Sequence, residues 1–391
     1  MKRLTSLAVL QLEQYDTTRF LAKKNINPEV IKRIKWTARL KLTKILSYPL
    51  GIVGANMVIG SAVKIYENWV WYRVRTRIQD LKKSGMKVVA IAGSYGKTTV
   101  KHYAHELLRH KFRVVSTPES FNTILGIAKC LEYEVDDRTE VFIVEVGAYH
   151  VGDITHLLKM VSPDIGVLTG IARQHLERFG SFAKIIQAKS EIAEYMKKVN
   201  GVLIVNGSDH NVVEAVQKIG IHAKLYDGIN REAINIAGAK LIARSLKIEE
   251  RELENNKIRP VKNRFEMTMD RYGMRVIDDS FSSNDKGFAD AVEHLGKQTK
   301  YTRILVTPGL VELGDQTKQI HEELGGKLVG NADLVILVGH NERTKSLEQG
   351  TKGKVKIMYI EKTLEFMRLV KSLKLKKEPL VLLENDVTEN Y

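Results

Sequence analysis

The stretch that most constrains the fold is residues 87–101, which read Lys-Val-Val-Ala-Ile-Ala-Gly-Ser-Tyr-Gly-Lys-Thr-Thr-Val-Lys. Residues 88–92 are apolar and rich in β-branched side chains, which is typical of a strand buried on both faces. Residues 93–96 (Gly-Ser-Tyr-Gly) end that strand, and Lys97 begins a helical pattern that runs through Arg109. A strand, a glycine turn, a Lys-Thr pair and a helix in this order predict a phosphate-binding loop.

The residue types in this loop suit a nucleoside triphosphate. Glycines let backbone N–H groups approach phosphate oxygens without a Cβ atom in the way. The helix that follows points its positive N-terminus at the same anion. Lys97 can reach the β- and γ-phosphates, and the Thr98 hydroxyl can ligate Mg²⁺. We therefore predict ATP and Mg²⁺ as cofactors, with nucleotide bound at Gly93, Ser94, Tyr95, Gly96, Lys97, Thr98 and Thr99.

The match to the general pattern G-x-x-x-x-G-K-[ST] is incomplete, because Ile91 occupies the position of the first glycine. The alternative is a tight turn between a strand and a helix, with an incidental lysine. The strand before the loop and the helix after it both favour the phosphate-binding interpretation.

Length and charge divide the chain into parts. A chain of 391 residues is expected to form two or three domains. The formal charge is +16, but residues 1–86 hold 17 Lys and Arg against five Asp and Glu, together with all three tryptophans. We therefore predict a basic helical module at residues 1–86, followed by a near-neutral enzyme body. The one cysteine, Cys130, excludes an internal disulfide and a multi-cysteine zinc site, and we expect it in the core.

Within the basic module, residues 1–44 read as two helices, and residues 45–63 are 19 positions without a charge. That length is at the margin of a membrane span, but Pro49 and three glycines interrupt it. Three interpretations stay open: a helix pair in the core of a soluble module, an interfacial or re-entrant segment, or a true span.

The basic, tryptophan-bearing surroundings of residues 45–63 favour an anionic membrane surface as a partner. Nucleic acid is not expected, because no recognised nucleic-acid motif accompanies the basic residues. No secretory signal is visible. We therefore predict a cytoplasmic location, peripheral at or anchored to the inner face of the membrane.

Residues 87–259 alternate between strand and helix patterns, which predicts an α/β domain with a mostly parallel, doubly wound sheet. A predicted strand over residues 141–146 carries Glu145 near its end. A carboxylate in that place lies on the ligand side of an open sheet, and its oxygen suits Mg²⁺. We predict Glu145 as a metal ligand; the alternative is a capped or paired surface glutamate.

Two further side chains stay ambiguous from the residues alone. His175 follows a predicted strand over residues 164–169, and it reads as a metal ligand, a base or a plain loop histidine. Lys189 lies on a predicted helix, where alone it reads as a solvated lysine.

Residues 260–391 predict a second α/β domain, Rossmann-like, with its boundary at Pro260. It begins with a hairpin-like pair of strands over residues 265–269 and 274–278, and further strands alternate with helices after it. No Gly-x-Gly-x-x-Gly fingerprint is present, so a dinucleotide cofactor is not expected.

From about residue 88 to its end, the chain resembles the Mur ligases, the ATP-dependent amide-bond ligases of cell-wall assembly. Within that family it is most similar to the type that adds D-alanyl-D-alanine to the UDP-N-acetylmuramoyl tripeptide. The matching motifs occur in the family's order: the loop at residues 93–99, Thr117-Pro118 with Asn122, Glu145-Val146-Gly147-Ala148, His175-Leu176-Glu177 with Phe179-Gly180, and Ala188-Lys189-Ser190-Glu191.

The resemblance implies a role for each motif. It implies that His175 ligates a second Mg²⁺ and that Lys189 is carbamylated, which turns a cation into an acidic oxygen ligand. The implied catalytic residues are Lys97, Glu145, His175 and Lys189. The implied metal ligands are Thr98, Glu145, His175 and carbamylated Lys189. The implied contacts to nucleotide are Asn235, Arg264 and Asp278, and those to substrate are Thr117, Asn122 and Asn284.

The chain departs from the family at two places. Where the D-alanyl-D-alanine-adding type usually shows Asp-Asp-x-Tyr-Asn-Ala-Asn-Pro, residues 278–285 read Asp-Asp-Ser-Phe-Ser-Ser-Asn-Asp. In addition, residues 1–86 look helical and basic, unlike the α/β domain with which the family grips the UDP end of its substrate. The acceptor and the incoming amine therefore stay open.

The implied reaction is ATP-dependent ligation of a carboxylate to an amine through an acyl phosphate, in peptidoglycan precursor synthesis. The implied substrates are a muramoyl peptide and an amino acid or dipeptide. One alternative is a related ligase with a lipid-linked, polyglutamate-type or cyanophycin-type acceptor. Others are a membrane-associated P-loop ATPase and a degenerate binding protein that keeps the fold without activity.

Overall fold

The computed structural model describes residues 38–385 except 119–120, 256–264, 270–273 and 281–283. The chain divides into two compact units, and the described part of the first is residues 38–73, while the second is residues 74–388. The helices predicted before residue 38 lie outside the described residues.

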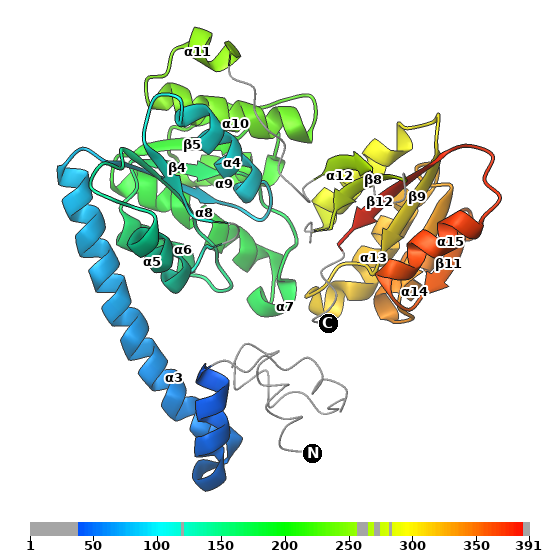
Figure 1. Ribbon diagram of the computed structural model, residues 1–391, viewed down its shortest axis with the longest axis horizontal. Helices are drawn as coiled ribbons and strands as arrows, with labels where there is room; N and C mark the ends of the chain where they lie inside the picture. Colours follow the sequence, from blue (N-terminus) through cyan, green and yellow to red (C-terminus); the bar gives the residue numbers. More distant parts are fainter. Residues whose placement is uncertain (1–37, 119–120, 256–264, 270–273, 281–283, 386–391) are drawn as a thin grey trace. The chain divides into compact units, whose positions relative to one another are not determined.

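The described chain begins with the long helix α3 (Ala38–Lys83), shown in blue in Figure 1. Its helical backbone is interrupted at Gly51, where φ is +70°, so residues 45–63 form helix on both sides of a kink. A positive φ is open to glycine at little steric cost, which explains why the kink falls there. In the part of the chain that the structure describes, no helix has both the length and the apolar content needed to cross a membrane.

The next part of the chain forms a six-stranded sheet, sheet A, in the order β2-β3-β1-β4-β5-β6 with every described pair parallel. This confirms the predicted parallel sheet. Its strands are β1 (Lys87–Ala92), β2 (Val114–Ser116), β3 (Val141–Glu145), β4 (Ile165–Leu168), β5 (Val202–Asn206) and β6 (Lys224–Tyr226). Its helices are α4 (Lys97–Leu108), α5 (Ile124–Tyr133), α6 (Asp153–Val161), α7 (Leu176–Phe179), α8 (Phe182–Lys198), α9 (His210–Ile219), α10 (Arg231–Ser245) and α11 (Glu250–Asn255).

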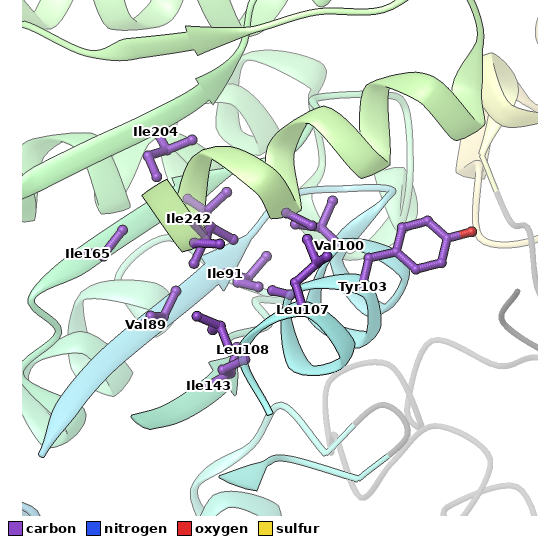
Figure 2. Close-up of a cluster of buried hydrophobic side chains, with 14 of the residues drawn as sticks. Val89, Ile91, Val100, Tyr103, Leu107, Leu108, Ile143, Ile165, Ile204 and Ile242 are labelled. Carbon is purple, nitrogen blue, oxygen red and sulfur yellow. The ribbon is translucent and has the colours of Figure 1, made fainter. Parts of the chain in front are cut away.

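Helices cover both faces of sheet A. On one face, Val89 and Ile91 of β1 pack against side chains of α4 and α10, including Leu107 and Ile242 (Figure 2). On the other face lies α8, because a Cβ atom added to Gly166 of β4 would contact α8 side chains. The alternation of side chains along a buried strand produces this two-sided core. Cys130 is buried on α5, as predicted.

The remainder of the chain forms a second six-stranded sheet, sheet B, in the order β11-β10-β9-β12-β8-β7. Only the β7–β8 pair is antiparallel among the described pairs, which confirms the predicted strand pair. Its strands are β7 (Glu266–Met269), β8 (Arg275–Asp279), β9 (Thr302–Thr307), β10 (Leu334–Val338), β11 (Lys356–Ile360) and β12 (Pro379–Glu384). Its helical segments are α12 (Asp285–Gly296), η2 (Gly314–Gln316), α13 (Thr317–Leu328), α14 (Glu342–Gly350), η3 (Thr363–Glu365) and α15 (Phe366–Ser372).

Sheet B also has two buried faces. Alternate residues of β9 and β10 contribute to different apolar clusters, so that Leu305 and Val335 face one cluster while Ile304 and Ile336 face the other. Both sheets therefore belong to the α/β class that the sequence predicts. In such sheets, the loops that follow the carboxyl ends of the parallel strands lie on the side where ligands bind.

Candidate active site

The loop between β1 and α4 has the backbone of a phosphate-binding turn. Gly93 adopts φ +148° and Gly96 adopts φ +78°, both unfavourable for residues with a side chain. A Cβ atom on Gly93 would lie 2.3 Å from the Thr169 hydroxyl of the neighbouring loop. Gly96 is the N-cap of α4, and it offers no side chain to the N–H groups of the first turn. The start of α4 therefore presents donors and a positive dipole end to an anion.

The other loop residues have definite places. Ser94 is buried, with its N–H donating to Gly170 O at 2.7 Å and its hydroxyl donating to Ala172 O at 3.2 Å. The Tyr95 hydroxyl donates to the buried carboxylate of Asp209, and burial, reinforced by Asp209, raises the pKa of Tyr95 above its ordinary range. Lys97, Thr98 and Thr99 form the half-buried first turn of α4. These contacts fix the loop against the segment that follows β4.

Glu145 lies at the end of β3, where its carboxylate accepts hydrogen bonds from three side chains, two of them on α4. The donors are Thr98 Oγ1 at 2.9 Å, Lys101 Nζ at 3.3 Å and Asn122 Nδ2 at 3.4 Å. Burial raises the pKa of the Glu145 carboxyl, but Lys97 and Lys101 outweigh that effect, so the pKa lies below its usual range. Glu145 is 1% exposed, so it is not a surface glutamate. It is paired, but its partners are other residues of the candidate site.

The predicted substrate residues Thr117 and Asn122 both hydrogen-bond to Glu145. Thr117 Oγ1 accepts the Glu145 backbone N–H at 3.1 Å, and Asn122 O accepts the Gly147 N–H at 3.2 Å. A Cβ atom at Gly147 would meet the Asn122 side chain at 2.8 Å, so the glycine permits this close approach.

Lys189 is buried on α8 and is 3% exposed, which is unlike a solvated lysine. Its ammonium group lies 3.5 Å from Ala148 O, which follows β3, and 5.7 Å from the centre of the Phe179 ring. Burial, reinforced by the nearby Lys97, lowers the pKa of Lys189 to about 7. The cationic P-loop lysine and this lysine are therefore near enough to interact.

His175 begins the short helix α7 with a left-handed backbone, φ +55°. Its Nδ1 atom contacts the carboxylate of Glu312, which follows β9, and its ring packs edge-on against Tyr149 with centroids 5.0 Å apart. Burial lowers the pKa of His175 below its ordinary value, although Glu312 opposes the change. When the imidazole is neutral and its Nδ1 atom is hydrogen-bonded, Nε2 is the ring atom that can coordinate a metal ion.

The predicted nucleotide residues after α9, and the predicted substrate residue Asn284, lie in several elements. Asn235 is buried on α10, and its Oδ1 lies 3.1 Å from the position of a Cβ on Gly96. Asp278 is half-buried on β8 and accepts the Ser280 N–H at 3.1 Å. Asn284 is buried and caps α12 by accepting the Gly287 N–H at 2.8 Å. Arg264 lies outside the described residues.

Three charged residues of this region were not among the predicted ones. Lys101 is one turn beyond Lys97 on α4, a helical spacing that the sequence contained. Asp209 is fully buried, accepts from Tyr95 and Ile171, and lies 3.2 Å from Lys286 Nζ. Glu312 lies 137 positions from its partner His175, so no local pattern pointed to it.

The donor set fits Mg²⁺ in part. Glu145 and Thr98 supply a carboxylate and a hydroxyl oxygen 2.9 Å apart, the hard ligands that this cation prefers. The amine of Lys189 suits Mg²⁺ only after it carries an oxygen-bearing group such as a carbamate. Within the described ranges, no three side chains of the types His, Cys, Asp and Glu gather as a metal site.

Two family models match the chain. The Mur ligase middle domain matches residues 91–275, and the Mur ligase glutamate ligase domain matches residues 263–384. Together they span about three quarters of the chain and include both sheets except for the start of β1. The chain belongs to the Mur ligase family.

Curated proteins named as D-alanyl-D-alanine-adding ligases are similar to about two thirds of this chain. The UDP-N-acetylmuramoyl-tripeptide--D-alanyl-D-alanine ligase of Haemophilus influenzae is 28% identical over 308 residues, which are 66% of this chain and 65% of that protein. The Bacillus subtilis protein of the same name is 25% identical over 64% of this chain and 63% of its own length. The matched part is thus slightly less than two thirds of these relatives.

Solved Mur ligase structures share the fold. A crystal structure of MurF from Acinetobacter baumannii has a TM-score of 0.70 at 21% identity and covers 83% of this chain and 78% of its own. MurF from Thermotoga maritima in complex with ADP has a TM-score of 0.69 at 22% identity, over 81% of this chain and 80% of its own. A pseudomurein peptide ligase type C from Methanothermus fervidus has a TM-score of 0.59.

Proposed function

We propose that this Mur ligase family member is an ATP-dependent carboxylate–amine ligase. Its reaction adds D-alanyl-D-alanine or a similar amine to a muramoyl peptide through an acyl phosphate. The single observation that carries the proposal is the buried cluster at the carboxyl edge of sheet A. There the P-loop threonine, Thr98, donates to Glu145, while Lys189 lies buried beside the segment that follows β3.

The names of the similar proteins support the choice of substrates. Curated relatives from several bacteria are named for D-alanyl-D-alanine addition to the muramoyl tripeptide. The ADP complex of a MurF with the same fold supports ATP as the phosphoryl donor. The departure at residues 278–285 keeps the incoming amine open, and a lipid-linked or polyglutamate-type acceptor is the second candidate.

In the proposed mechanism, the loop amides at the start of α4 and the Lys97 ammonium bind the terminal phosphates of ATP. A substrate carboxylate attacks the γ-phosphorus and ADP leaves, which gives an acyl phosphate. The amine then attacks the acyl carbon, and inorganic phosphate leaves as the amide forms. Thr117 and Asn122, which hydrogen-bond to Glu145, would orient the acceptor near this edge.

Mg²⁺ would be held by Thr98 and Glu145, with a second ion held by His175 and carbamylated Lys189. When bound, the metal would neutralise charge on the transferred phosphoryl group. Asn235, Arg264 and Asp278 would contact the nucleotide, and Asn284 the substrate. In this proposal the chain consists of residues 1–86, 87–259 and 260–391, and the nucleotide is shared between the second and third parts.

An anionic membrane surface is the proposed partner of residues 1–86, of which the structure describes residues 38–86, and the proposed location is cytoplasmic, peripheral at or anchored to the inner face of the membrane. Many large apolar side chains of this segment are exposed beside exposed cations such as Lys41 and Lys64. The exposed apolar side chains are Leu42, Ile45, Tyr48, Leu50, Met57, Val58, Ile65, Tyr66, Trp69 and Tyr72. Apolar side chains interleaved with lysines suit the headgroup region of an anionic leaflet.

Vesicle sedimentation tests this partner. The full chain should co-sediment with vesicles that contain phosphatidylglycerol, and added salt should weaken the association, because it screens the attraction. Pure phosphatidylcholine vesicles are the control. Equal sedimentation with both kinds of vesicle, or with neither, would contradict an anionic surface as the partner.

The ligase proposal is tested by phosphate release from ATP with the muramoyl-tripeptide nucleotide, with and without D-alanyl-D-alanine, and with mass detection of product. Release that needs both substrates and yields a pentapeptide is the expected result. Release without substrate, and without an amide product, would instead indicate a P-loop ATPase. Product only with a lipid-linked acceptor would support the second candidate.

A further inference from the structure

The loop between β9 and η2 places one glutamate against the helix that begins with His175. Glu312 has a left-handed backbone, φ +58°, and its side chain is 3% exposed. His175 also has a left-handed backbone, φ +55°. Residues with a side chain rarely adopt this conformation. Two such residues in direct contact indicate that the surrounding structure holds both in place.

Glu312 directs its carboxylate and its backbone carbonyl at residues 175–178. One carboxylate oxygen contacts His175 Nδ1, and the other accepts from Arg178 Nε at 2.8 Å and from the Arg178 Nη2 atom. Its carbonyl oxygen accepts the Glu177 N–H at 2.9 Å. A single glutamate from the sheet B part of the chain therefore fixes the start of α7 in three ways.

This arrangement orients the imidazole. A carboxylate can only accept when ionised, so Nδ1 carries the proton and the lone pair of Nε2 is available to a metal ion. The edge-on contact with Tyr149 limits rotation of the ring, and Arg178 stacks over the Tyr149 ring at 4.5 Å. Histidine ligands in metalloproteins commonly have a carboxylate on the other nitrogen, which sets both tautomer and direction.

We propose that Glu312 is a positioning residue for His175. The imidazole then points at its metal only when the loop after β9 is packed against α7. The metal site in the sheet A part of the chain therefore depends on a residue of the sheet B part. This inference rests on the proposed function, because it takes His175 as a metal ligand. A role restricted to stability, through the Arg178–Glu312 ion pair, is the competing explanation.

Metal binding tests the proposal without turnover. Mn²⁺, which is paramagnetic, is titrated into the full chain with a non-hydrolysable ATP analogue and followed by electron paramagnetic resonance. Glu312→Gln keeps the size of the side chain but removes its charge. We expect Glu312→Gln to weaken the His175-dependent Mn²⁺ site about 10- to 100-fold, the range found when partners of metal-bound histidines are lost.

The matched control is Glu323→Gln. Glu323 pairs with Arg173 at 2.7 Å, a contact that also joins the segment after β4 to the sheet B part of the chain, but it does not touch His175. Its Mn²⁺ affinity should stay within twofold of the parent. Unchanged Mn²⁺ affinity in Glu312→Gln, or an equal loss in Glu323→Gln, would overturn the proposal.

A second readout separates orientation from stability. The ring nitrogens of ¹⁵N-histidine-labelled protein report which nitrogen carries the proton, and His175→Gln identifies the resonance. The parent should show a protonated Nδ1 that is altered in Glu312→Gln. If Glu312→Gln does not fold, Glu312→Asp still decides, since its shorter carboxylate should weaken Mn²⁺ binding, and parental affinity there would contradict the proposal.

The outcomes also separate this inference from the proposed function. A parent protein that binds Mn²⁺ and nucleotide but forms no amide would refute the ligase proposal and leave the role of Glu312 measurable. A parent that forms amide, together with a Glu312→Gln variant of parental Mn²⁺ affinity, would refute only the inference.

Discussion

Helices α4 and α12 begin at comparable places, each after a strand of a largely parallel six-stranded sheet. Their N-termini differ in whether a side chain accepts a hydrogen bond from the first turn. α12 is capped by the side chain of Asn284, which accepts the Gly287 N–H. α4 is preceded by Gly96, which has no side chain to offer, and its first turn carries no acidic residue. One helix start has a side-chain acceptor for an N–H group of its first turn, whereas the other has none, as suits a helix end that binds an anion.

A second contrast concerns α14 in sheet B and the edge of sheet A where Glu145 lies. In sheet B, Asn341 closes the start of α14 with a capping box, and the buried His321 accepts the Leu310 N–H at 2.9 Å. At the edge of sheet A, Lys101 and Glu145 are buried together. Buried charge of this kind is costly unless it is paired, and it is retained where chemistry needs it. Among the described residues, the edge of sheet A combines a buried Lys101–Glu145 pair with an uncapped helix start, whereas α12 and α14 of sheet B both begin with a side-chain cap.

The largest effect should come from Lys97→Ala, which removes the cation at the uncapped helix start. We expect ligation to fall on the order of 10³-fold, because charge on the transferred phosphoryl group loses a partner. Amide formation measured by mass spectrometry checks this. Lys111→Ala, which removes a half-exposed lysine paired with Glu252, is the control and should keep parental activity. If Lys97→Ala ligated at nearly the parental rate, the start of α4 would not be the reaction site that distinguishes it from the start of α12.

The next effect concerns the buried lysine of the same edge. Lys189→Ala should lose ligation, and short carboxylates added to the assay should restore part of it, since they can replace a carbamate oxygen. Lys184→Ala, an exposed lysine on the same helix, should behave as the parent. Loss without rescue by any carboxylate would leave the carbamate without support, while retained activity would remove Lys189 from the site.

A backbone substitution should have a smaller effect that is still specific to the loop. Gly93→Ala places a methyl group 2.3 Å from the Thr169 hydroxyl, and it should cost about 1–3 kcal/mol of stability and weaken nucleotide binding. Gly330→Ala also has a positive φ, +81°, but an added Cβ meets nothing within 4 Å. It should cost about 1 kcal/mol and leave nucleotide affinity unchanged. Urea unfolding and nucleotide titration measure both, and equal effects on affinity would contradict the loop assignment.

The smallest effect should come from the capped helix of sheet B. Asn341→Ala removes the capping box of α14 and should lower the free energy of unfolding by about 1 kcal/mol, with phosphate release unchanged. Denaturant unfolding and the phosphate assay check the two parts. A large fall in turnover would show that this helix start also serves the reaction, which would weaken the contrast between the sheets.

Much of the fold could be predicted because local pattern carries it. The apolar runs at residues 88–92 and 202–206 became β1 and β5, and the turn between β1 and α4 was readable from its glycines. Helices α6, α9 and α14 were not predicted, since they lie in segments read only as connections between strands. The kink in α3 was anticipated as an interruption of residues 45–63, but its position at Gly51 required the structure.

The sequence by itself determined the glycine turn between β1 and α4 and the family of the chain, since these depend on residues adjacent in the chain. Only the tertiary structure decided which side chains meet. Lys101 and Glu145 are 44 positions apart, Tyr95 and Asp209 are 114 apart, and His175 and Glu312 are 137 apart. Helical and strand periodicity relate only near neighbours. Contacts at these separations exist because packed strands and helices bring distant loops to one edge, where buried charges must find partners.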